Sequence, residues 1–156
     1  GRSLSPPKGT EDGVLTPAAF RFSSLREPEG AMRSVLVVDD DAEMRALLVD
    51  VLRNDGFDVA EAGDGADAVL ALRNRQFDVI LMDKNMPGPS GLDLLPGFRR
   101  ACPQSRIIMM TALVDVPSYV YALEKGAVDY LFKPFRMEEM KGAVRRALEL
   151  GTESQA

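Results

Sequence analysis

The sequence predicts an α/β fold in which a parallel β-sheet lies between two layers of helices. Two observations lead to this prediction. From residue 34 onward, short apolar runs alternate strictly with segments of helical periodicity, and no stretch of the sequence is repeated. Strict alternation favours parallel strands joined by helical crossovers, and right-handed crossovers place helices on both faces of the sheet.

The first half of the alternation contains three predicted strands and two predicted helices. Val35–Val38 is a continuous apolar run, as expected for a strand that is covered on both faces. Apolar residues at helical spacing then predict a helix over 44–52, which the turn residues at 54–56 end. Strands are predicted next at 57–60 and 77–82, with a helix at 66–75 between them.

The second half repeats this order. The predicted elements are a helix at 91–101, a strand at 106–110, a helix at 116–125, a strand at 128–132 and a helix at 137–148. Pro96 lies inside the first of these helices, which we therefore expect to be short or kinked. Five strand–helix units indicate a flavodoxin-like (βα)5 three-layer sandwich, with a five-stranded sheet in the order 2-1-3-4-5.

The two ends of the chain differ from this domain, which we expect to span 33–150. Residues 1–31 are rich in Gly, Pro and Ser and have no sustained periodicity. We interpret them as a disordered tail, a linker or a non-native remnant, and we expect 151–156 to be a flexible C-terminus.

The composition excludes several classes of function. The chain has no His and one Cys, Cys102, so disulfide, zinc and His-dependent catalytic sites are not expected. Its net charge is −5 without a long basic run, which does not favour a nucleic-acid-binding surface. No apolar run is long enough for a membrane span and the start does not read as a signal peptide, so we expect a cytoplasmic protein with no membrane partner.

Polar residues gather where the predicted strands end. Asp39 and Asp40 follow the first strand, Asp83 the third, Thr111 the fourth and Lys133 the fifth. Because the carboxyl ends of parallel strands meet at one edge of the sheet, we expect these side chains to converge. The next residue, Asp41, is better explained as the N-cap of the following helix.

This set of side chains suits phosphoryl transfer. Carboxylate oxygens without Cys or His favour Mg²⁺, and an Asp carboxylate can be phosphorylated as a nucleophile. Lys133 and Mg²⁺ would neutralise the phosphoryl charge, while Thr111 and the backbone N–H of Ala112 could donate to its oxygens.

Four stretches resemble response-regulator receiver domains, the phospho-acceptor modules of two-component signalling. They are SVLVVDDD, DVILMDKNMPGPSG, the dipeptide Thr111-Ala112 and DYLFKPF. The resemblance implies that Asp83 is the phospho-acceptor and that Asp39, Asp40, Asp83 and the backbone carbonyl of Asn85 hold Mg²⁺. It also implies that Thr111 and Tyr130 are switch residues, that Lys133 binds phosphate, and that the Lys133–Pro134 peptide is cis.

The resemblance also implies partners. The phosphoryl donor would be a sensor histidine kinase or a histidine phosphotransfer protein. The face built from the fourth helix, fifth strand and fifth helix would bind an unknown output partner or form a homodimer. The chain would then be a signalling switch and not an enzyme, except for its own phosphorylation and dephosphorylation. Ser90 departs from the family, which often has Asp or Asn there, but it can still cap the third helix.

Two other functions are compatible with the fold class. A flavin-binding electron carrier needs a phosphate-cradling loop after the first strand, where this chain has three acidic residues that would repel phosphate. An aspartate-nucleophile hydrolase commonly has a second Asp two residues after the nucleophile as general acid, and Asn85 occupies that position.

Overall fold

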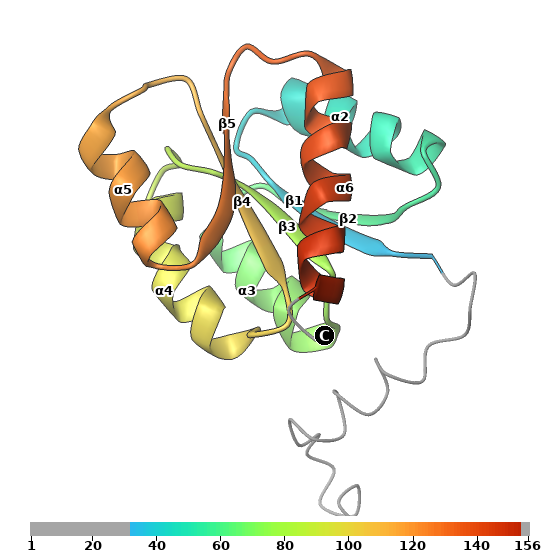
Figure 1. Ribbon diagram of the computed structural model, residues 1–156, viewed down its shortest axis with the longest axis horizontal. Coiled ribbons are helices and arrows are strands. Elements are labelled where there is room, and N and C mark those ends of the chain that lie inside the picture. Colours follow the sequence, from blue (N-terminus) through green and yellow to red (C-terminus); the bar gives the residue numbers. More distant parts are fainter. Residues whose placement is uncertain (1–31, 154–156) are drawn as a thin grey trace, which may run out of the picture. The chain divides into compact units, whose positions relative to one another are not determined.

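A parallel sheet of five strands forms the centre of the computed structural model, which describes residues 32–153 (Figure 1). The strands are β1 Ser34–Val38, β2 Asp58–Ala62, β3 Val79–Asp83, β4 Arg106–Thr111 and β5 Ala127–Phe132. Their order is β2-β1-β3-β4-β5, so the predicted topology is confirmed. The expectations for residues 1–31 and 154–156 lie outside the described residues.

Helices cover both faces of the sheet, as predicted (Figure 1). They are α2 Ala42–Asn54, α3 Gly65–Asn74, α4 Gly91–Ala101, α5 Val116–Glu124 and α6 Met137–Glu153. Alternate strand residues enter two separate apolar clusters, because successive side chains of a strand point to opposite faces. Val35 and Val37 pack with α2 and α6, whereas Leu36 packs with α3, α4 and α5.

Local sequence explains where the helices begin. The carboxylate of Asp41 accepts hydrogen bonds from the backbone N–H groups of Glu43 and Met44, so the predicted N-cap is confirmed. Ser90 caps α4 and forms a capping box with Asp93. The expected shortening of α4 is not observed, since the helix keeps its full predicted range with Pro96 inside it.

Some element ends differ from the prediction. β2 begins at Asp58 and not at Phe57, because the Phe57 N–H still bonds to Leu52 O at the end of α2, where Gly56 has a φ of 95°. Helix α6 continues to Glu153, past residue 150, where we expected the domain to end.

Two findings concern expectations from composition. Cys102 is buried at the C-cap of α4, and burial raises the pKa of its thiol, which agrees with a packing role. Within residues 32–153, no helix has the length and apolar character that crossing a membrane requires.

Candidate functional site

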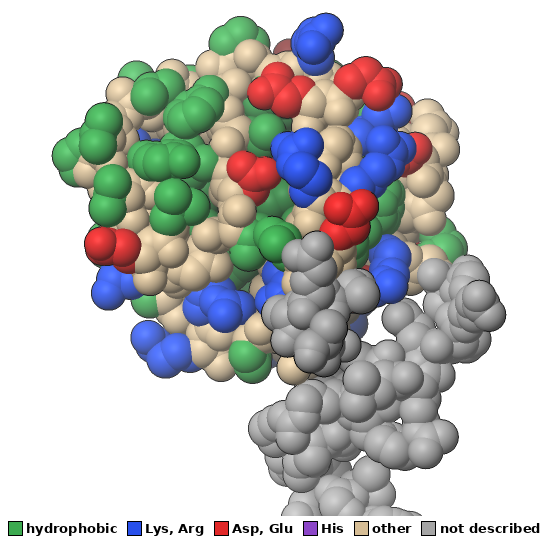
Figure 2. Space-filling view, viewed as in Figure 1, with side chains coloured by type: hydrophobic (Ala, Val, Ile, Leu, Met, Phe, Trp, Pro, Cys, Tyr) green, Lys and Arg blue, Asp and Glu red, His purple; other side chains and the backbone are tan. Residues whose placement is uncertain are grey.

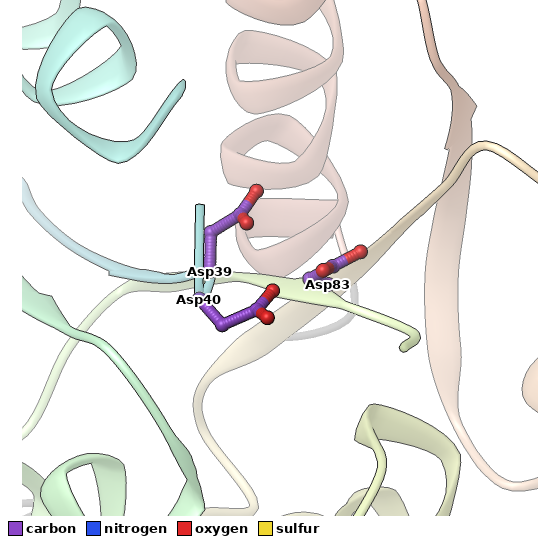
Figure 3. Close-up of side chains that lie close together, drawn as sticks. All are labelled: Asp39, Asp40 and Asp83. Carbon is purple, nitrogen blue, oxygen red and sulfur yellow. The ribbon is translucent and has the colours of Figure 1, made fainter. Parts of the chain in front are cut away.

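The acidic residues meet at the carboxyl edge of the sheet because β1 and β3 are neighbouring strands. Val38 of β1 is paired with Met82 of β3, so Asp39 and Asp83 occupy adjacent strand ends. Figure 3 shows Asp39 and Asp40 on the segment that leaves β1 and Asp83 at the end of β3. One carboxylate oxygen from each of the three residues lies within 4.8 Å of the others. The predicted convergence is therefore confirmed for the acids.

The three acids differ in their surroundings. Asp39 and Asp83 are buried, while Asp40 is exposed to solvent. Asp39 is held on several sides: its N–H bonds to Ala62 O at 3.1 Å, and its Oδ1 accepts from the N–H of Asp41 at 2.9 Å. The site therefore combines two buried carboxylates with one that water can reach.

Lys133 joins the acids from the end of β5. Its Nζ lies 2.9 Å from Asp39 Oδ2 and 3.6 Å from Asp83 Oδ1. Burial alone would lower the pKa of Lys133, but its bond to Asp39 and the charge of Asp83 outweigh burial and raise the pKa. The ammonium therefore stays charged. The peptide bond between Lys133 and Pro134 is cis, as the resemblance implied.

Asp83 has a raised pKa of about 6, against an ordinary value of 3.8. Burial is the largest cause and the negative charge of Asp39 is the second, while Lys133 and the N–H of Asn85 act in the opposite direction. Crowded, buried carboxylates disfavour ionisation unless a cation compensates. Three hard oxygen donors that repel one another in this way fit a divalent cation such as Mg²⁺.

The remaining predicted residues surround this cluster. Thr111 is buried at the end of β4, with Ala112 exposed beside it, and the N–H of Lys133 bonds to Thr111 O at 2.7 Å. The Thr111 hydroxyl donates to Leu113 O at 2.9 Å and accepts from Leu113 N at 3.0 Å. Asn85 is exposed and its N–H points at Asp83, whereas the role of its carbonyl stays a prediction.

Tyr130 lies within β5, three residues before Lys133, and is 6% exposed. Its ring makes edge contacts with Tyr119 and Phe132, each with centroids 5.3 Å apart. The ring therefore already lies in the apolar core in this structure. The switch role of Tyr130 stays a prediction.

Two contributors to the site were missed by the sequence analysis. Arg45 of α2 donates to the backbone carbonyl of Asp39 at 2.7 Å and to Glu61 Oε1 at 2.9 Å, which fixes the segment after β1. Gly91 begins α4 against β3, where a Cβ would lie 2.2 Å from Asp83 O. The sequence shows that Arg45 lies one helical turn after the N-cap Asp41, but it does not show that Arg45 donates to the carbonyl of Asp39.

A third missed feature is the side chain next to Asp83. Lys84 is 7% exposed, and its Nζ lies 2.7 Å from the carboxylate of Asp115 at the N-cap of α5. This bond is the largest cause that lowers the pKa of Asp115 to about 2. The bond links the end of β3 to α5, the helix that follows Thr111 and Ala112.

Comparison with known proteins identifies a family for this chain. Residues 35–145 match the family model of the response regulator receiver domain. The chain is 43% identical over 114 residues to the DNA-binding response regulator MtrA of Mycolicibacterium paratuberculosis, covering 73% of this chain and 50% of that protein. It is 37% identical over 119 residues to the DNA-binding transcriptional regulator NtrC of Azospirillum brasilense, covering 76% of this chain and 25% of that protein.

A solved structure supports the same assignment. Chemotaxis protein CheY4 of Vibrio cholerae superposes with a TM-score of 0.72 at 31% identity, covering 76% of this chain and 100% of that one. The chain therefore belongs to the response-regulator receiver domains, the phospho-acceptor modules of two-component signalling. It spans about half the length of the first curated relatives that it matches. The flavin-carrier and hydrolase alternatives are not supported.

Proposed function

We propose that Asp83 accepts a phosphoryl group from a phosphohistidine of a sensor histidine kinase or a histidine phosphotransfer protein. The observation that carries this proposal is the Asp39, Asp40 and Asp83 cluster with Lys133 against two of its members. An Asp83 oxygen attacks the phosphorus atom, a P–O bond forms, the P–N bond to the donor breaks, and its electron pair stays on the imidazole nitrogen.

The residues present fit Mg²⁺, which would be held by Asp39, Asp40, Asp83 and the carbonyl of Asn85. When bound, the cation supplies charge neutralisation for the phosphoryl oxygens. Lys133 adds a second positive charge, and the Thr111 hydroxyl and the N–H of Ala112 donate hydrogen bonds to the remaining phosphoryl oxygens. The same three residues also act when the phosphoryl group is lost to water. The chain is thus proposed to catalyse only its own phosphorylation and dephosphorylation.

Labelling with a small phosphodonor tests the acceptor. Acetyl phosphate with Mg²⁺ should label the wild-type protein on one residue, identified by mass spectrometry as Asp83, and chelation of divalent ions should abolish labelling. Asp83→Asn should remove the label, while Asp50→Asn, which removes an exposed carboxylate from α2, should keep it. Stoichiometric labelling of Asp83→Asn would exclude Asp83 as the acceptor.

We also propose that the output surface lies on α5 and the end of β5. Eight large apolar side chains are exposed in the loop before α5, on α5 itself and at the end of β5: Leu113, Val114, Val116, Tyr119, Val120, Tyr121, Leu123 and Phe132. Figure 2 shows hydrophobic side chains gathered over α5, whereas charged side chains interrupt the surface over α6. Contiguous exposed apolar surface of this kind favours an interaction site, here for an output partner or a second copy of the domain.

Self-association with and without a phosphoryl mimic tests this surface. Beryllofluoride with Mg²⁺ should change the sedimentation behaviour of the wild-type protein or its affinity for a partner, and Tyr119→Ala should reduce the change. Leu47→Ala, an exposed apolar residue on α2, is the matched control. The assignment is wrong if the mimic has no effect, or if Tyr119→Ala responds like the control.

The names of two relatives bear on nucleic acid as a partner. MtrA and NtrC are named as DNA-binding regulators. This chain has a net charge of −5 and no long basic run, so we propose that its own residues do not bind nucleic acid. A cytoplasmic location stays a prediction.

A further inference from the structure

The ion pair between Lys84 and Asp115 is not explained by the phosphorylation chemistry. The backbone of Lys84 is fixed on both sides, since its N–H bonds to Met110 O at 2.7 Å and its carbonyl accepts from Gly91 N at 2.8 Å. Its ammonium lies 2.7 Å from Asp115 Oδ2, while Asp115 Oδ1 accepts from Ser118 N, also at 2.7 Å. One carboxylate therefore caps α5 and fastens that helix to the acceptor strand.

The loop between Thr111 and Asp115 is consequently held at both ends. At its start, the Thr111 hydroxyl both donates to and accepts from the backbone of Leu113. A hydroxyl has a single proton, so Thr111 cannot donate to a phosphoryl oxygen while it donates to Leu113 O. Donation from Thr111 to a phosphoryl oxygen therefore breaks its hydrogen bond to Leu113 O, and Leu113 lies two residues before Asp115, which Lys84 holds.

We propose that Lys84 and Asp115 form a positioning pair that stabilises the resting arrangement of this loop and so limits the availability of Thr111 to the phosphoryl group. The inference rests on the proposed function of Asp83. A contact made mainly in the resting arrangement opposes the other arrangement by its differential free energy. Breaking the pair therefore favours the phosphoryl-bound arrangement, without any change to the acids or to Lys133.

Asp115→Asn is the sharpest test, because Asn caps helices as well as Asp does but carries no charge for Lys84. Lys84→Met removes the ammonium and keeps an unbranched side chain in its place. Asp64→Asn makes the same cap exchange at α3, where Asp64 accepts from Asp67 N at 2.9 Å and has no ion pair within the described residues. The double variant Lys84→Met/Asp115→Asn tests whether the two residues act as one unit.

Two measurements separate the pair from the phosphorylation chemistry. In protein free of divalent ions, amide hydrogen exchange of Leu113 should be faster in Asp115→Asn and Lys84→Met than in wild type and Asp64→Asn. In a beryllofluoride titration with Mg²⁺ followed by NMR, both pair variants should bind the mimic about two- to fivefold more tightly than wild type. The double variant should gain no more than the better single variant.

Unchanged Leu113 exchange and unchanged or weaker mimic binding in Asp115→Asn would overturn the positioning pair while leaving the acceptor assignment intact. If wild-type protein fails to bind the mimic, the proposed function of Asp83 is wrong, and Leu113 exchange alone then decides whether the pair holds the loop.

Discussion

Removing the charge of Asp83 should stabilise the domain when no divalent cation is bound. The carboxylate of Asp83 is buried beside that of Asp39, and both burial and this like charge raise the pKa of Asp83 from 3.8 to about 6. Asp83→Asn keeps the shape of the side chain and removes the repulsion. Lys133 stays paired after the exchange, since its closer partner is Asp39 at 2.9 Å.

The magnitude follows from linkage between ionisation and folding. A rise from 3.8 to about 6 corresponds to about 3 kcal/mol at ~1.36 kcal/mol for each pH unit, and residual solvent access reduces this to about 2–3 kcal/mol. Because the folded-state pKa is raised, the ionised carboxylate destabilises the fold above pH 6. The penalty declines as pH falls from 6 to 3.8 and is absent below 3.8, where both states are protonated.

Urea unfolding followed by circular dichroism at several pH values measures this effect. In EDTA at pH 8, Asp83→Asn should unfold with a free energy about 2–3 kcal/mol above that of wild type, and the difference should shrink toward pH 4. Asp50→Asn, the exposed control on α2, should change little. With Mg²⁺, ligand binding should stabilise wild type more than the variant and narrow or reverse the difference.

The reasoning would be refuted by an Asp83→Asn protein that is less stable than wild type in EDTA at pH 8. A gain of the same size at pH 4 would also contradict it, because ionisation of Asp83 could not then be the cause.

Three further changes test separate parts of the structure. Gly91→Ala should lower the free energy of unfolding by about 2–3 kcal/mol, since its Cβ would lie 2.2 Å from Asp83 O; a neutral effect in urea unfolding would contradict the close approach. Tyr130→Phe should leave stability unchanged or raise it by up to about 1 kcal/mol, because the Tyr130 hydroxyl is buried without a hydrogen-bond partner within residues 32–153; a loss above ~1 kcal/mol would indicate an unseen partner. Leu113→Glu should lose a phosphoryl label faster than wild type, because the 64% exposed Leu113 offers water no hydrogen bond; equal or slower loss in a chase experiment would refute this role.

The strand ends were predictable because they depend on local patterns. Buried parallel strands are continuous apolar runs, and a polar residue marks the point where each run leaves the core, as at Asp39 and Asp83. Because β1 and β3 are neighbours in the predicted strand order, Asp39 and Asp83 were expected to lie next to each other. Strand starts were less predictable, since an apolar residue such as Phe57 can pack on the core while its backbone still belongs to a helix end.

Contacts between distant side chains could not be predicted in the same way. Lys84 and Asp115 are 31 positions apart, and neither the spacing nor the residue types distinguish a half-buried ion pair from two solvated charges. Arg45 likewise reads as an ordinary helix surface residue until the carbonyl of Asp39 is placed beside it. Such contacts depend on how two elements approach each other, which periodicity does not encode.

The weak anchoring of α5 connects the site with the apolar surface. Its nine residues include one buried side chain, Ala122, whereas α6 buries Met140, Ala143, Val144 and Ala147. The position of α5 therefore depends more on its cap at Asp115 and on contacts such as that of Tyr119 with Tyr130 than on core packing. An element held in this way can be displaced by a coupling free energy of about 1–3 kcal/mol, without loss of the core. A phosphoryl group at Asp83 would thus act on the helix that carries most of these exposed apolar side chains, because Lys84, the residue next to Asp83, holds the cap of that helix.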